Sequence, residues 1–254
     1  MNIYRMLAYE GTRTFVGPWV SFALRVRSEC ADNVPDEGGA LLVCNHRSMI
    51  DPLVLMTEID RYMHFITAAH GSVLPMLKTF YRMTGLVQRS EEEGGRAATG
   101  LDESGRFLDS GELVCVFPEG IDSLMRPDKV SRVSYFRTGF ARVALKAGVP
   151  IIPAAIIPMD EIRLPLIAEQ VVESYEQHTP VKAGPFRYFL YKKVLLRIGN
   201  PISLEGFRGE PLTKASIDML SGKVRKIIMK LYSGEDLDRF LYGKVPFDVY
   251  TDRV

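Results

Sequence analysis

A histidine and an aspartate stand five residues apart in the stretch CNHRSMIDP, residues 44 to 52. Apolar runs adjoin it on both sides, ALLV before and LVLM after, so its polar residues fill a gap between two buried-looking segments. If the carboxylate of Asp51 accepts the proton of one imidazole nitrogen of His46, it fixes the tautomer of that ring. The other nitrogen is then a base that could take the proton of an alcohol.

Each residue of this pair also has a purely structural interpretation. Asp51 precedes Pro52, and proline favours the first position of a helix, so Asp51 could be a helix N-cap. His46 could simply lie in a loop at a strand end. Ser48 is close in sequence, but the chain has no G-x-S-x-G motif that would present it as a nucleophile. The pairing of His46 with Asp51 favours the base.

A second polar turn, FPEG at 117–120, follows the apolar run ELVCV. Glu119 could bind a hydroxyl-bearing acceptor, and Gly120 would let backbone N–H groups come close to a ligand. An ordinary β-turn explains this turn when it is considered alone. Together with His46, however, it places polar residues after two strand ends, where the chemistry of open α/β sheets gathers.

The elements that must position these residues follow from hydrophobic periodicity. Strands are expected at 40–44, 62–67, 84–89, 112–117, 150–156 and 194–202. Helices are expected at 52–59, 72–83, 91–111, 134–148 and 212–232, with Gly148 at a helix carboxyl cap. The alternation predicts a single α/β domain with a mostly parallel or mixed β-sheet flanked by helices.

The amino-terminal segment, 1–32, is expected to be amphipathic and distinct from the domain at 33–254. Its apolar residues are Tyr4, Leu7, Phe15, Trp19, Phe22 and Val26, with arginines on the other side. It could be a helix packed on the core or a helix lying on a membrane. GPFRYFLYKK at 184–193 is another candidate membrane surface, or an amphipathic strand or helix against the core. No apolar run reaches the roughly 20 residues of a membrane span, and the amino terminus does not resemble a signal peptide.

Composition excludes several classes of protein. The 254 residues include 32 Lys and Arg against 31 Asp and Glu, so net charge gives no reason to expect a nucleic-acid partner. Hydrophobic residues make up 46% of the chain, enough for a sizeable core. The three cysteines include no C-x-x-C pair, which indicates reduced thiols in a cytosolic compartment and no zinc site.

NHRSMID at 45–51 resembles the N-H-x-S-x-x-D block of the glycerolipid acyltransferases, the lysophosphatidate acyltransferase-like family. Three further blocks occur in the order of that family: GLVQR (85–89), FPEG (117–120) and VPIIP (149–153). Together the four blocks cover residues 40 to 157, and VLLRIGNPI resembles the strand and turn that usually follow them.

The resemblance implies an O-acyltransferase in phospholipid biosynthesis, similar to 1-acylglycerol-3-phosphate acyltransferases. His46 would be the general base and Asp51 would orient it. The donor would be the thioester of acyl-CoA or acyl carrier protein, and the acceptor a hydroxyl of a lysophospholipid or related lipid. The other implied roles are acceptor binding at Arg89, Glu119 and Gly120, and an acyl-chain wall at Pro150 and Pro153. No metal or cofactor is implied, and the enzyme would lie in the cytoplasm, peripherally on the inner face of the membrane.

The third block departs from the pattern of this family. It usually reads F-P-E-G-T-R-S, whereas this chain reads FPEGIDS, with Asp122 where an arginine is expected to contact a phosphate. Asp122 would repel a phosphate. Either Arg126 or Arg137 compensates by contacting the head group, or the acceptor carries no phosphate and is a neutral glycerolipid, a sugar-bearing lipid or another alcohol.

Three other functions fit the same residues. The base could activate water and make the chain an acyl-thioester hydrolase. His46, Asp51 and Glu119 could be the ligands of a metal-dependent phosphoesterase, although the sequence offers no second histidine nearby to complete such a site. The chain could also be a non-catalytic lipid-binding relative.

Overall fold

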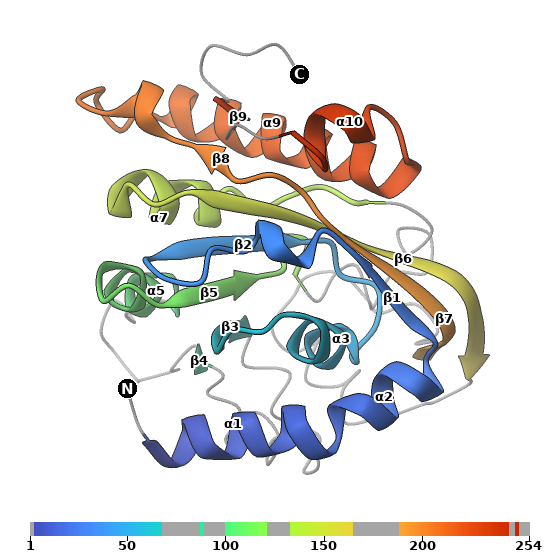
Figure 1. Ribbon diagram of the computed structural model, residues 1–254. Coiled ribbons are helices and arrows are strands. Elements are labelled where there is room, and N and C mark those ends of the chain that lie inside the picture. The colour runs from blue at the N-terminus through green and yellow to red at the C-terminus, as the bar shows by residue number, and fades with distance from the viewer. Residues whose placement is uncertain are drawn as a thin grey trace, which may run out of the picture.

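A mixed β-sheet forms the centre of the molecule (Figure 1). The computed structural model describes residues 3–67, 87–88, 100–120, 133–164, 188–243 and 247–248. The strands are β1 (Val26–Glu29), β2 (Ala40–Cys44), β3 (Met63–Thr67), β4 (Val87–Gln88), β5 (Leu113–Val116), β6 (Ile151–Leu164), β7 (Tyr188–Ile198), β8 (Ile202–Ser203) and β9 (Phe247–Asp248). Their main order is β1-β7-β6-β2-β5-β3-β4, with β8 paired to β6 and β9 to β8.

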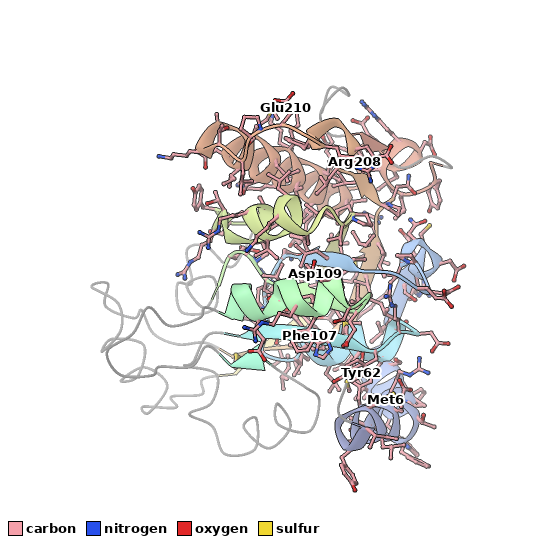
Figure 2. The ribbon with its side chains drawn as sticks, turned by 90° about the vertical axis from the view of Figure 1, so that its left-hand side faces the viewer. Met6, Tyr62, Phe107, Asp109, Arg208 and Glu210 are labelled. Carbon is pink, nitrogen blue, oxygen red and sulfur yellow. The ribbon has the colours of Figure 1, made fainter. Side chains whose placement is uncertain are left out.

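Helices cover both faces of this sheet, as the sequence predicted. They are α1 (Ile3–Phe15), α2 (Gly17–Ala23), α3 (Asp51–Glu58), α5 (Gly100–Asp109), α7 (Gly139–Ala147), α9 (Lys214–Ser233) and the short α10 (Leu237–Phe240). Figure 2 shows the layers from the side, with Met6 of α1 at one end and Arg208 and Glu210, just before α9, at the other. The predicted helix at 72–83 lies outside the described residues.

The alternation of side chains along β2 creates two hydrophobic cores. Leu41 and Val43 pack toward α5, α7 and α9, whereas Ala40, Leu42 and Cys44 pack toward α1 and α3. All five residues of β2 are buried, because successive side chains of a strand point to opposite faces and here helices cover both.

The parallel pairing of β2 with its neighbours defines the edge where its polar loop lies. β2 pairs in parallel with β5, from Ala40 opposite Leu113, and with β6, from Leu41 opposite Ile151. The carboxyl ends of β2 and β5 therefore meet at one edge. The loops that follow them, beginning at Asn45 and Phe117, are neighbours in space.

β6 and β7 form a long antiparallel ribbon that the sequence predicted only in part. Pairing runs from Ala154 opposite Ile198 to Leu164 opposite Tyr188, with register shifts around Asp160. β6 thus continues well past the predicted end at Ile156, and β7 begins before the predicted start at Val194. The strand extends to Leu164 through charged residues, whereas the prediction followed the apolar run alone and therefore ended at Ile156.

The last long helix, predicted at 212–232, is present as α9 and has one buried apolar stripe. Leu220, Val224, Ile227, Ile228 and Leu231 of α9 are buried. A capping box between Thr213 and Ser216 begins the helix, and Gly234 in the left-handed conformation ends it. In α7 the predicted carboxyl cap at Gly148 is likewise left-handed, but the helix begins at Gly139 rather than at 134.

The amino-terminal segment combines features of both sequence alternatives, because it packs on the domain and also exposes apolar side chains. α1 and α2 contact the rest of the molecule through the buried Tyr9 and Gly17, and through hydrogen bonds from Arg13 to Asp60 and from Ser21 to Glu58. The exposed apolar side chains of these helices are Ile3, Tyr4, Leu7, Phe15, Val16, Trp19 and Phe22. Residues 26–29, within the same predicted segment, form β1, which pairs with β7 at the edge of the sheet.

Candidate active site

His46 and Asp51 lie together in the loop between β2 and α3. His46 Nδ1 is 2.9 Å from Asp51 Oδ2. The Asp51 side chain is fully buried, whereas 14% of the His46 side chain is exposed. Because Nδ1 faces the carboxylate, Nε2 is the ring nitrogen that points away from it. The sequence-predicted pair is therefore in contact, with the ring reachable by solvent and the acid enclosed.

Asp51 is held by four donors. Its Oδ2 also accepts the backbone N–H groups of Arg47 and Ser48, at 2.7 and 2.9 Å, and its Oδ1 accepts the hydroxyl of Tyr191 at 2.5 Å. Asp51 is the first residue of α3 and Ile50 is the N-cap, which corrects the predicted N-cap role. Its carboxylate reaches back to the preceding loop instead, and so closes that loop around the acid.

The ring of His46 lies against the neighbouring loop. It stacks on Phe117 with 4.3 Å between ring centroids and 22° between planes. Phe117 follows β5 directly, so the parallel pairing of β2 and β5 creates this contact. The ring is thus fixed on one face by an aromatic side chain and at Nδ1 by a carboxylate.

Glu119 joins the two loops rather than pointing outward. Its Oε1 accepts the N–H of His46 at 2.9 Å, and its Oε2 accepts the N–H of Ser134 at 2.7 Å. Only 5% of the residue is exposed, and burial raises the pKa of this carboxyl. Its predicted contact with an acceptor stays a prediction, since both oxygens hold backbone donors here.

Gly120 and Arg137 lie side by side at the same edge. Gly120 has a φ of +67°, which favours glycine, and a Cβ there would lie 3.3 Å from Arg137 Cζ. The Arg137 N–H donates to Pro118 O at 2.9 Å. The exposed Arg137 is therefore the sequence-predicted cation that the described structure brings to this edge, while Arg89 and Arg126 lie outside the described residues.

Asn45 extends the pairing of β2 with β6. Its side chain accepts the N–H of Ile156 at 2.8 Å and donates to Ile156 O at 3.0 Å. This pair of bonds imitates a strand partner and fixes the residue directly before His46. The sequence signal for Asn45 was its place in NHRSMID, but its partner is 111 residues away.

The β6–β7 ribbon holds the remaining residues of the loop. Arg47 makes two bonds to Glu161, at 2.9 and 2.6 Å, and lies over the ring of Phe189. The Ser48 hydroxyl donates to Phe189 O at 2.5 Å and is buried. A structural role for Ser48 agrees with the absence of a nucleophile motif. Phe189 and Tyr191 are buried in β7, which agrees with the alternative of an amphipathic strand against the core for these two residues.

The two predicted prolines occupy different places. Pro150 precedes β6 beside the amino end of β2, at the opposite edge of the sheet from His46, so the structure does not bring it to the pair. Pro153 lies within β6 opposite Val43, and its ring faces the Cα of Gly199. The predicted acyl-chain wall therefore cannot include Pro150 beside the histidine.

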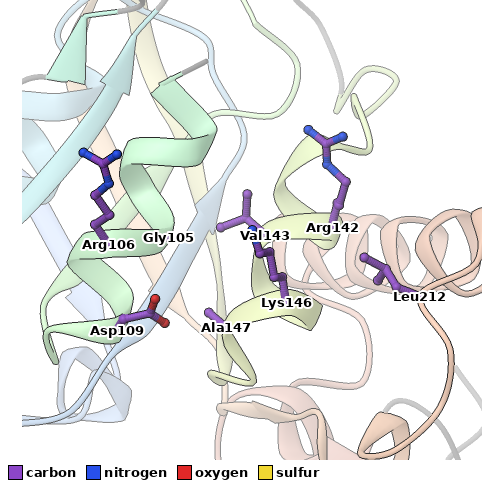
Figure 3. A pocket seen from close by; sticks show the side chains of 8 residues that line it. All are labelled: Gly105, Arg106, Asp109, Arg142, Val143, Lys146, Ala147 and Leu212. Carbon is purple, nitrogen blue, oxygen red and sulfur yellow. The ribbon is translucent and has the colours of Figure 1, made fainter. Parts of the chain in front are cut away.

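A pocket of about 470 Å³ lies between α5 and α7, lined by Arg106, Asp109, Arg142, Lys146 and four further residues (Figure 3). The last turns of these two helices lead into the amino ends of β5 and β6, so this pocket lies away from His46.

The described residues contain neither a membrane-spanning helix nor a metal-binding cluster. No helix among them is long and apolar enough to cross a membrane. No group of three His, Cys, Asp or Glu residues among them is arranged to hold a metal ion. Asp51 and Glu119 use both oxygens of each carboxylate on hydrogen-bond donors, which does not fit shared ligation of a cation.

The fold and the loop define an α/β protein with a His–Asp pair at the carboxyl edge of its sheet. A family model described as Acyltransferase matches residues 25–157. That match covers about half of the chain and contains both His46 and Asp51. The chain therefore belongs to the acyltransferase family, as the sequence blocks predicted.

Curated proteins of similar sequence include an uncharacterized protein and a probable acyltransferase. An uncharacterized protein of Mycobacterium tuberculosis is 29% identical over 239 residues, covering 87% of this chain and 64% of the relative. The chain thus spans less than two thirds of the length of that relative. A probable 1-acyl-sn-glycerol-3-phosphate acyltransferase of Mycoplasma pneumoniae is 30% identical over 131 residues, covering 50% of this chain and 47% of the relative.

A solved structure has the same fold. The crystal structure of the 1-acyl-sn-glycerophosphate (LPA) acyltransferase PlsC from Thermotoga maritima aligns with a TM-score of 0.56 and 20% sequence identity. The alignment covers 89% of this chain and 81% of that chain. The predicted fold class is confirmed.

Proposed function

We propose that this chain is an O-acyltransferase that moves a fatty acyl chain from a thioester donor to a hydroxyl of a lysophospholipid or related lipid. The observation that carries the proposal is the contact between His46 Nδ1 and the buried Asp51, 2.9 Å long, with the ring partly open to solvent. Membership of the acyltransferase family and the name of the Mycoplasma pneumoniae relative point to the same reaction.

The proposed reaction needs no covalent enzyme intermediate. His46 Nε2 accepts the proton of the acceptor hydroxyl as its oxygen attacks the thioester carbonyl, and Asp51 stabilises the imidazolium. The tetrahedral intermediate collapses with loss of the thiolate, which takes the proton back from His46. An ester bond forms and a thioester bond breaks, and the donor is released as a thiol, either CoA or acyl carrier protein.

Orientation and general-base catalysis supply the acceleration in this scheme. A positioned base is typically worth about a hundredfold to ten-thousandfold in rate. His46 meets the requirement for positioning, because Phe117 and Asp51 fix its ring and the N–H of His46 is tied to Glu119. Gly120 lies beside Arg137 on the same edge, where a polar head group of the acceptor would be bound.

The hydrophobic surface of α1 and α2 is the proposed contact with the membrane that carries the acceptor. Seven apolar side chains, defined above, are exposed there, among them Trp19 at 74% and Phe22 at 81%. Tryptophan and tyrosine favour the interface between lipid and water. We place the enzyme peripherally on the inner face of the membrane.

The decisive test of the reaction is the substitution His46→Asn. Asparagine can still reach Asp51 but is no base, so transfer of acyl groups from acyl-CoA to mixed lysolipids should fall about a hundredfold or more. His64→Asn is the matched control, because His64 of β3 pairs with Glu112, directly before β5, and is not part of the loop that carries His46. Product lipids are identified by mass spectrometry, which also distinguishes phosphate-bearing from neutral acceptors.

Assays without an acceptor separate transfer from hydrolysis. A transferase releases CoA from acyl-CoA only when an acceptor alcohol is present, whereas a hydrolase releases it at the full rate in buffer. If His46→Asn transfers acyl groups at the wild-type rate, His46 is not the general base and the proposal is wrong.

A further inference from the structure

The phenol of Tyr191 occupies a distinctive position behind the His46–Asp51 pair. It is 3% exposed and belongs to β7, 140 residues away from Asp51 in sequence. Its hydroxyl lies 2.5 Å from Asp51 Oδ1, a length typical of a hydroxyl donating to an ionised carboxylate. Burial and the neighbouring carboxylate raise the pKa of Tyr191, so the phenol keeps its proton and acts as the donor.

The two oxygens of Asp51 have separate partners. Oδ2 faces His46 and the two backbone N–H groups, whereas Oδ1 has Tyr191 as its donor among the described residues. A carboxylate rotates about its Cβ–Cγ bond unless both oxygens are engaged. Tyr191 therefore fixes the plane in which Oδ2 meets the imidazole.

From this geometry we infer that Tyr191 is a positioning residue for acyl transfer, acting through Asp51 to orient and tune His46. The inference rests on the proposed function and extends it to the β6–β7 ribbon. In that ribbon Glu161 is the cross-strand partner of Tyr191. Glu161 accepts hydrogen bonds from Arg47, and Tyr191 donates one to Asp51. Two adjacent ribbon residues thus hold two residues of the loop that carries the base.

The substitution Tyr191→Phe removes only the hydroxyl. With the donor gone, kcat should fall about tenfold, in line with loss of a hydrogen bond to a charged group, while KM for both substrates stays unchanged. Tyr9→Phe is the matched control: Tyr9 is fully buried in the same core layer, and its hydroxyl donates to Arg61 O at 3.3 Å. It should keep the wild-type kcat with a soluble, short-chain acceptor.

The pH profile distinguishes positioning from simple loss of packing. Asp51 Oδ2 should hold the imidazolium more tightly once its charge is no longer shared with a phenol. The acidic limb of kcat/KM should therefore move to higher pH in Tyr191→Phe and stay in place in Tyr9→Phe. The other ionisable groups around this contact are Arg47, Glu119, Glu161 and Cys44, and neither substitution alters them.

A double-mutant cycle asks whether Tyr191 acts through Asp51. Asp51→Asn combined with Tyr191→Phe should be no slower than Asp51→Asn alone. The inference would be overturned if Tyr191→Phe lowered kcat as much in the Asp51→Asn background as in the wild type. An unchanged kcat and pH profile in Tyr191→Phe would also overturn it. If His46→Asn abolishes transfer while Tyr191→Phe is normal, only this inference fails. If His46→Asn stays active, the proposed function itself fails.

A measurement on the unmodified chain covers the case in which Tyr191→Phe does not fold. In protein labelled with 13C-tyrosine, the hydroxyl proton of Tyr191 should resonate downfield and shift as His46 titrates. A signal that ignores this titration contradicts the coupling.

Discussion

At the scale of single residues, the carboxylates of this edge act on the backbone as much as on side chains. Asp51 accepts two backbone N–H groups beside His46 and Tyr191, and Glu119 accepts two more, from loops that follow different strands. Buried carboxylates that satisfy several N–H donors fix a loop more firmly than packing alone. The position of His46 is therefore set through its own backbone N–H and those of Arg47 and Ser48.

Glu119 gives a prediction about the dependence of stability on pH. Burial raises its pKa above the ordinary value of 4.5, so ionising it costs the folded state free energy. The contribution of this group to stability is fully present below 4.5 and is lost as pH rises through the raised pKa. Glu119→Gln removes that loss, so the free energy of unfolding of the variant relative to wild type should rise with pH across this window.

Denaturant titrations at several pH values measure this difference. At pH 4 the free energy of unfolding of Glu119→Gln should be about 1–3 kcal/mol lower than that of the wild type. The reason is that the amide NH2 group cannot accept the second backbone N–H. Glu103→Gln, at an exposed position of α5, is the control and should show no such trend. A parallel offset between wild type and Glu119→Gln at all pH values would contradict the prediction.

At the scale of elements, α1–α2 and the β6–β7 ribbon direct their aromatic side chains differently, mostly outward in the helices and inward in the ribbon. α1–α2 turns most of its large apolar side chains outward, while Tyr9 packs into the core. The ribbon turns Phe189 and Tyr191 inward and exposes Met159 and Ile162. Exposed apolar side chains gathered on one helical pair indicate an interaction surface rather than a core face.

The surface of α1–α2 predicts a loss of lipid binding when it is charged. Trp19→Glu with Phe22→Glu should weaken sedimentation with anionic vesicles at least tenfold, since each aromatic side chain contributes roughly 1.5–3 kcal/mol when buried. Tyr242→Glu, exposed near α10 on the opposite side of the molecule, should bind like the wild type. Wild-type protein that stays in the supernatant at low salt would contradict the proposed membrane contact.

At the scale of the whole molecule, the end of β7 is where several elements meet. The N–H of Gly199 donates to Pro153 O at 2.7 Å, and a Cβ added there would lie 2.9 Å from atoms of Pro153, Leu231 and Phe240. That position joins the sheet to both α9 and α10. The close approach of three elements, not a turn conformation, is what requires a glycine here.

The substitution of alanine for two glycines should therefore have opposite effects. Gly199→Ala should destabilise the protein by roughly 1–3 kcal/mol, the usual cost of overpacking. Gly222→Ala, at an exposed position inside α9 with open space around it, should stabilise it by about 0.5–1 kcal/mol. Midpoints of urea unfolding measure both changes, and equal shifts of the same sign would refute the packing described here.

The sequence alone determined most of what depends on neighbouring residues. Hydrophobic periodicity predicted β2, α3, β5 and α9, because a strand or helix repeats its burial every two or about 3.6 residues. The contact between His46 and Asp51 was predicted from their closeness in sequence, because only four residues separate them. The resemblance in the flanking blocks then indicated the family.

Only the tertiary structure decided what lies between segments far apart in the chain. Tyr191 and Glu161 reach the loop of His46 because β6 and β7 pair beyond the sheet, and no local pattern encodes that pairing. The outward face of α1–α2 was equally undetermined, since an amphipathic helix can turn its apolar side to a core or to a membrane. Periodicity specifies which side of an element is apolar, but the partner of that side is fixed only when the whole chain packs.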